Sequence, residues 1–182
     1  SPQPPKVDGV ILSAPAVWGR ETMPFYQRWA LGIVSYTMPW LTLTGRGLKI
    51  KPSDNIEMLR ALGRDPLVIK ETRVDTVHGL TNLMDAALAA SDKFDKKSLI
   101  LYGMQDEVVP KDPTIQMLRR LPKSAHERQR IAIYKKGYHM LLRDLKAKTF
   151  WHDIAAWIKN PHAPLPSKAD AGARARIVSE SP

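Results

Sequence analysis

Three short runs of apolar residues constrain the fold of this chain more than any other feature of its sequence. They span residues 7–13 (VDGVILS), 99–102 (LILY) and 130–134 (RIAIY). Apolar runs of this kind, without a regular polar alternation, are typical of strands in a parallel sheet whose two faces are covered by helices. The sequence therefore predicts an α/β fold in which all three runs are parallel strands buried on both faces.

Helical patterns separate and follow the second and third runs. Residues 113–121 (PTIQMLRRL) have apolar side chains at helical spacing after a first-turn proline, and Asp112 is the predicted N-cap. Residues 144–159 show the 3.6-residue period of an amphipathic helix. The stretch 99–159 is thus predicted to be strand, helix, strand and helix.

The other segments differ from this α/β unit. Residues 17–90 are rich in Trp, Met and Leu, show no strand alternation and contain predicted helices at 53–62, with Ser53 as N-cap, and at 76–91. We expect four parts: a core strand in 1–16, a helical insertion or lid in 17–90, the rest of the core in 91–160, and a flexible tail rich in Pro, Ala, Ser and Lys in 161–182.

The composition excludes several kinds of site. The chain has no cysteine, which rules out disulfides, thiolate metal ligands and a cysteine nucleophile, and its five histidines show no HExxH spacing. We expect neither a metal nor a cofactor. The formal net charge of +10 comes from scattered basic residues without interleaved aromatic side chains, so no nucleic-acid partner is expected.

The chain carries no predicted membrane span or secretion signal. Residues 1–6 lack the apolar core of a signal peptide, and the most apolar stretch, 29–43, is shorter than the roughly 20 residues that cross a bilayer. A cytoplasmic or peripheral membrane location is favoured.

Two candidate catalytic side chains follow the second and third runs. Asp106 lies in the sequence GMQDEVVP and His139 in GYHMLLRD, each just beyond a predicted strand. Because the carboxyl ends of adjacent parallel strands lie about 5 Å apart at the edge where open α/β sheets assemble their sites, we expect the two side chains to meet. A carboxylate bound to one imidazole nitrogen orients a histidine that takes a proton from a nucleophile.

The nucleophile for such a pair is not evident in the sequence. It would precede the acid in the chain, and the serines upstream of Asp106, at positions 1, 13, 35, 53, 91 and 98, lack the GxSxG pattern of a nucleophile elbow. We therefore expect the serine to lie in an N-terminal part outside this chain. Glu107 is an alternative acid, and Asp144 is interpreted as an N-cap or surface partner of the last helix.

Four motifs together resemble the monoacylglycerol lipase and lysophospholipase branch of the α/β-hydrolases, which includes the S33-type serine aminopeptidases. They are VILSAP at 10–15, RDPL at 64–67, GMQDEVVP at 103–110 and GYHMLLRD at 137–144, and the resemblance covers about residues 7 to 160. It implies that the three runs are the last strands of that fold and that residues 17–90 form a cap lining an acyl-binding tunnel. It also implies that Asp106 and His139 are the acid and base of a Ser-His-Asp triad.

The function implied by the resemblance is that of a serine ester hydrolase, lysophospholipase-like or monoacylglycerol lipase-like, acting on carboxylic esters with apolar acyl chains. Its expected partners are a lipid or small ester substrate and the N-terminal half of the same protein, without which this chain is expected to be inactive. The cap is also a candidate membrane contact. Two alternatives stay open: a binding module of this fold without catalysis, and a peptidase or dehalogenase of the same fold.

Overall fold

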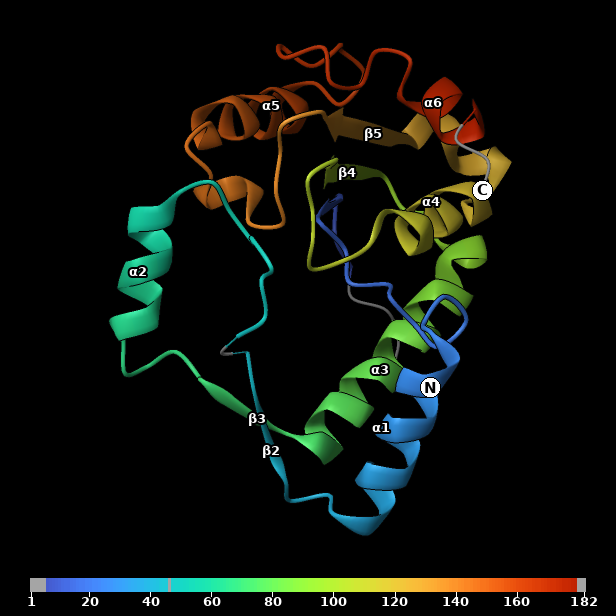
Figure 1. Ribbon diagram of the computed structural model, residues 1–182. Coiled ribbons are helices and arrows are strands. Elements are labelled where there is room, and N and C mark those ends of the chain that lie inside the picture. The colour runs from blue at the N-terminus through green and yellow to red at the C-terminus, as the bar shows by residue number, and fades with distance from the viewer. Residues whose placement is uncertain (1–5, 46, 180–182) are drawn as a thin grey trace.

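The computed structural model describes residues 6–45 and 47–179, and a three-stranded parallel sheet lies at its centre (Figure 1). The strands, in spatial order, are β1 (Val10–Ser13), β4 (Ser98–Gly103) and β5 (Gln129–Tyr134). Each strand coincides with one of the three apolar runs. The predicted α/β class, with the runs as parallel strands, is confirmed.

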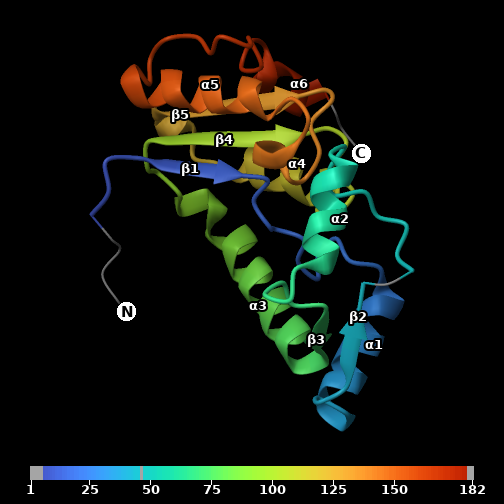
Figure 2. The same ribbon diagram turned by 90° about the vertical axis from the view of Figure 1, so that its left-hand side faces the viewer.

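The middle strand, β4, shows why a parallel strand is apolar throughout. All six of its residues are buried. Leu99 and Leu101 point to one face, where α5 (Ala147–Lys159) packs, and Ile100 points to the other face, where α3 (Val74–Ala90), α4 (Lys111–Arg120) and α6 (Ala173–Ser179) contribute core residues (Figure 2). Successive side chains of a strand alternate in direction, so two covered faces require an unbroken apolar run.

β1 is less buried than its sequence predicts. Among the described strands it pairs only with β4, and its residues alternate between partly buried and exposed. A strand with one neighbour and incomplete cover keeps part of its surface open. The expectation that this run is buried on both faces is therefore wrong for the chain as described.

The segment between β1 and β4 extends away from the sheet and is mainly helical (Figure 2). It contains α1 (Phe25–Thr37), α2 (Ile56–Arg64) and α3. It also contains two strands that the sequence did not indicate, β2 (Thr42–Thr44) and β3 (Glu71–Arg73), which pair antiparallel. Every residue of these two strands is exposed, so no alternation of buried and exposed positions marked them. Three short 3₁₀ helices are η1 (Ser91–Lys93), η2 (Lys123–Arg128) and η3 (Leu141–Arg143).

Two helices begin at other residues than predicted. The N-cap of α2 is Asn55, whose Oδ1 accepts a hydrogen bond from Met58 N at 3.1 Å, whereas the predicted cap, Ser53, is fully buried in another contact. α4 begins at Lys111 without a side-chain cap, so Asp112 lies in its first turn. A carboxylate in the first turn still stabilises the positive end of the helix dipole.

The residues after α5 pack onto the core, which corrects the expectation of a flexible tail. Leu165 and Ala169 join the buried cluster that includes α5, and Ala173 and Ile177 join the cluster that includes α4. Ala169 also accepts a backbone hydrogen bond from Ile133 N of β5, at 3.0 Å. Apolar residues at every fourth position were enough to anchor a sequence otherwise typical of a tail. Of the expected terminal parts, residues 1–5 and 180–182 lie outside the described residues.

We predict that Leu165→Ala lowers the free energy of unfolding by about 2–5 kcal/mol, because it leaves a cavity in the core. Leu165 is 2% exposed. The measurement is urea unfolding of the longest natural protein that contains these residues. The matched control is Leu145→Ala, at a side chain that is 71% exposed, with an expected change within about 0.5 kcal/mol. Equal changes in the two variants would mean that the segment after α5 is not part of the core in solution.

Candidate active site

The loops that follow β4 and β5 meet at two glycines. A Cβ atom at Gly103 would lie 2.3 Å from Gly137 O, and one at Gly137 would lie 2.4 Å from Leu141 Cδ2. Met104 N donates to Tyr134 O and Gln105 N donates to Gly137 O, both at 2.9 Å. The missing side chains thus let the two strand exits pack directly on each other.

This packing brings Asp106 and His139 together. Asp106 Oδ2 lies 2.9 Å from His139 Nδ1, and Asp106 Oδ1 accepts hydrogen bonds from Val108 N at 2.8 Å and Val109 N at 2.9 Å. The Asp106 side chain is fully buried, while that of His139 is 28% exposed. The carboxylate is therefore fixed by three hydrogen bonds and in turn fixes the imidazole ring.

The direction of the Asp106–His139 hydrogen bond determines what the ring can do. An ionised carboxylate only accepts hydrogen bonds, so Nδ1 of His139 is the nitrogen that carries the hydrogen. Nε2 is then the basic nitrogen, and it makes no hydrogen bond to any residue that the structure describes. Such a ring can accept a proton from a hydroxyl group placed beside it, and the buried carboxylate stabilises the resulting imidazolium.

The other two carboxylates near these loops contact different groups. Glu107 Oε2 accepts a hydrogen bond from Lys51 N at 2.7 Å, whereas the His139 ring bonds to Asp106. Asp144 is 3% exposed and accepts hydrogen bonds from Ser53 Oγ at 2.6 Å and Tyr138 N at 2.9 Å. Its interpretation as an N-cap or surface residue is wrong, because the residue that caps α5 is Lys146.

The segment 51–55, which leads into α2, contacts both loops. Each of its five residues takes part in a hydrogen bond to them: Lys51 N to Glu107, Met140 N to Pro52 O, Ser53 Oγ to Asp144, Leu145 N to Asp54 Oδ1, and Asn55 Nδ2 to Arg143 O. We infer that this segment positions the histidine loop. The sequence did not reveal it, because consecutive Ser, Asp and Asn residues are each a normal N-cap and nothing local distinguishes the buried one.

Two further properties of the described residues bear on the chemistry. No group of three or more His, Cys, Asp or Glu side chains among them is arranged to hold a metal ion. No helix in the described ranges is both long enough and apolar enough to cross a membrane.

Comparison with known proteins assigns the family. Residues 1–146 match the family model described as serine aminopeptidase, S33. The chain belongs to this S33 family. No match to a curated protein was found. The predicted α/β-hydrolase resemblance is thus confirmed at the level of family and fold.

Two crystal structures share the fold of this S33 chain. The Paleococcus ferrophilus monoacylglycerol lipase aligns with a TM-score of 0.69 and 21% identity over 87% of this chain and 60% of that one. A soluble variant of monoglyceride lipase from Saccharomyces cerevisiae, in complex with a substrate analog, aligns with a TM-score of 0.65 and 16% identity over 86% and 56%. This chain therefore spans less than two thirds of the length of either protein.

We predict that Ser53→Ala lowers the free energy of unfolding by about 1–3 kcal/mol, because it leaves a buried oxygen of Asp144 without its hydroxyl donor. Chemical unfolding of the longest natural protein measures the loss. The control is Ser35→Ala, which removes an exposed hydroxyl that donates to Gly32 O in α1, with an expected change within about 0.5 kcal/mol. A Ser53→Ala loss as small as that of the control would exclude a stabilising role for the Ser53–Asp144 contact.

Proposed function

We propose that the complete protein is a serine ester hydrolase in which Asp106 and His139 are the acid and base of a Ser-His-Asp triad. The observation that carries this proposal is the 2.9 Å contact between Asp106 Oδ2 and His139 Nδ1 at the carboxyl ends of adjacent parallel strands. That edge of the sheet is where α/β folds assemble their sites. The S33 family and the lipase fold of the two similar structures agree with this reaction class.

The proposed mechanism uses both ring nitrogens of His139. A serine hydroxyl attacks the acyl carbon of the ester while His139 Nε2 takes its proton, and Asp106 stabilises the imidazolium through Nδ1. The same proton then passes to the leaving alcohol, and water hydrolyses the acyl-enzyme by the reverse use of the base. No cofactor takes part in these steps.

We further propose that the serine and the oxyanion-hole amides come from an N-terminal part of the protein that precedes β1. The sequence upstream of Asp106 contains no GxSxG, and the chain spans 60% and 56% of the two similar structures. β1 also has a free edge among the described strands, and its side chains are only partly covered. Further strands that pair with β1 would cover this edge and extend the sheet to the nucleophile.

The decisive experiment is fluorophosphonate labelling of the longest natural protein, together with hydrolysis of p-nitrophenyl butyrate and 1-oleoylglycerol. We expect His139→Ala to abolish labelling and to lower turnover on the order of 10⁴-fold or more, and Asp106→Asn to lower it on the order of 10³–10⁴-fold. Glu107→Gln is the matched control for the acid, and we expect a much smaller loss, because its carboxylate contacts Lys51 instead of the histidine.

The outcomes separate the alternatives. A loss for Glu107→Gln that equals the loss for Asp106→Asn would reassign the acid. A natural protein that takes no label and hydrolyses neither ester would contradict the catalytic proposal and favour a binding module of the same fold. Labelling with cleavage of peptide instead of ester substrates would favour a peptidase.

We also propose that residues 17–90 form the cap over the site, that an apolar acyl chain binds beneath it, and that α1 contacts a membrane surface. On one face of α1, Phe25, Trp29, Ile33 and Tyr36 follow each other at helical spacing, and each is more than half exposed. The opposite face packs on α3. Arg20 and Arg28 line a groove beside Trp29 and Tyr36. Aromatic and basic side chains on one exposed helix face are typical of helices that lie in a membrane interface.

We predict that Trp29→Ser weakens binding of the natural protein to vesicles of phosphatidylcholine with phosphatidylglycerol, because it removes an aromatic side chain from the interface. A several-fold loss is expected from the apolar area removed, and cosedimentation measures it. Trp151→Ser, at an exposed tryptophan of α5, is the matched control and should leave vesicle binding unchanged. Equal effects of the two substitutions, or no vesicle binding at all, would rule out α1 as the contact.

A further inference from the structure

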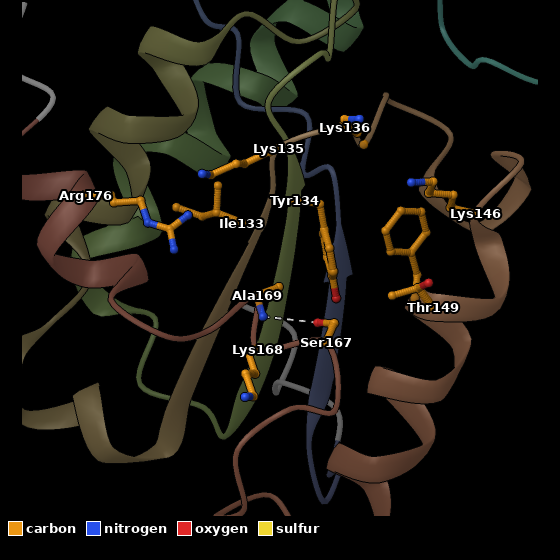
Figure 3. A pocket seen from close by; sticks show the side chains of 12 residues that line it. Ile133, Tyr134, Lys135, Lys136, Lys146, Thr149, Ser167, Lys168, Ala169 and Arg176 are labelled. Carbon is orange, nitrogen blue, oxygen red and sulfur yellow. Dashed lines mark hydrogen bonds between the residues drawn. The ribbon is translucent and has the colours of Figure 1, made fainter.

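We propose that a cavity beside the carboxyl end of β5 binds a small organic phosphate, an anionic phosphate group attached to an apolar or aromatic body. The cavity has a volume of about 380 Å³ and lies between β5, the first turn of α5 and the segment 167–176 (Figure 3). This volume falls in the range of roughly 300–1,000 Å³ that is usual for small-molecule sites. Neither Asp106 nor His139 lines it.

The charge around this cavity has one sign. Lys135, Lys136, Lys146, Lys168 and Arg176 line it, and no Asp or Glu does. They come from three separate stretches of the chain, and Figure 3 shows Lys135 and Arg176 on one side of Tyr134 and Lys146 on the other. Like charges held around a small space repel each other, so an anion bound among them stabilises the arrangement.

These cations also lack the partners that basic side chains have elsewhere in the protein. Arg20, Arg120 and Arg130, for example, each form an ion pair with a carboxylate. By contrast, the four lysines of the cavity make no side-chain hydrogen bond or ion pair with any described residue. Arg176 donates only to a backbone carbonyl, Ala171 O, at 2.8 Å. The donors around the cavity are therefore available to a ligand.

The first turn of α5 adds to the positive field. Lys146 and Thr149 line the cavity from this turn, which contains no acidic residue and has no side-chain cap. The N-terminus of a helix carries a partial positive charge and exposed N–H groups that favour anions. Together with the lysines, which suit phosphate as compact point charges, this favours a dianionic phosphate over a single carboxylate.

The walls of the cavity are apolar, which is why we infer an organic ligand. Ile133, Phe150 and the Tyr134 ring form them, and the Tyr134 and Phe150 rings meet edge to face, with centroids 4.5 Å apart. The Tyr134 hydroxyl donates to Asp153 Oδ2 at 2.7 Å, and burial together with Asp153 raises the pKa of Tyr134 well above its usual value. The ring therefore stays neutral and offers its surface to an apolar group.

One buried carboxylate lies behind these walls. Asp153 is fully buried and accepts hydrogen bonds from Tyr134, from Ser167 N at 3.0 Å and from Ser167 Oγ. Its charge is thus satisfied by three donors and does not line the cavity. The contact also fixes Ser167, and with it the segment that carries Lys168 and Arg176. Four of the lining residues come from this segment, which lies outside the part that matches the S33 family model.

The test is isothermal titration calorimetry of the longest natural protein with 1-naphthyl phosphate, in a His139→Ala background that removes any ester hydrolysis. We expect saturable 1:1 binding that weakens as salt rises, weaker binding of inorganic phosphate, and none of uncharged 1-naphthol. Lys135→Gln/Lys146→Gln should weaken 1-naphthyl phosphate binding about tenfold or more, since two charged hydrogen-bond donors are lost. The matched control is Lys148→Gln, which removes an exposed charge from the same helix turn but not from the cavity.

Each other outcome overturns the proposal. A similar loss in Lys148→Gln would show a general surface charge effect instead of a site. Equal binding of 1-naphthol would show an apolar pocket without anion selectivity, and equal binding of inorganic phosphate would exclude a role for the apolar walls. Absence of binding at millimolar ligand, in a variant whose circular dichroism spectrum matches that of the natural protein, would reject the site altogether. The result is independent of the proposed esterase activity, because no residue of the cavity belongs to the triad.

Discussion

The close contact between the two strand exits is the constraint on which the candidate site depends. Gly103 and Gly137 are so close that a Cβ atom on Gly103 would overlap the backbone of Gly137, and backbone hydrogen bonds join the two loops. Only this approach brings a carboxylate from one loop within 2.9 Å of an imidazole from the other. The chemistry proposed for Asp106 and His139 therefore rests on backbone packing before it rests on the two side chains.

A second layer of contacts holds these loops from outside. Residues 51–55 bond to the loop of Asp106 through Glu107 and to the loop of His139 through Asp144 and its neighbours. The same residues lead directly into α2 of the segment that we propose as the cap. Any displacement of the cap is thus coupled to the histidine loop through buried hydrogen bonds, of which Ser53 with Asp144 is the most enclosed.

The segment after α5 gives this S33 chain a feature beyond the matched family region. Its apolar residues cover both sides of β5, and its Ser167 bonds to the buried Asp153. The sheet edge at β5 is covered in this way, and a cavity rich in lysine forms where the segment meets α5. A part of the chain that looked dispensable by composition thus builds the wall of a second candidate site.

The sequence by itself determined the three parallel strands, the α/β class and the identity of Asp106 and His139 as the pair to examine, because strand burial and loop position leave local patterns. Only the tertiary structure decided the partners of Ser53 and Asp144, the exposed pair of β2 and β3, the open surface of β1 and the packing of residues 161–179. The physical reason is the range of the interactions. Periodicity reports how a segment is covered, whereas a buried serine bonded to a carboxylate 91 residues away leaves no mark on its own neighbourhood.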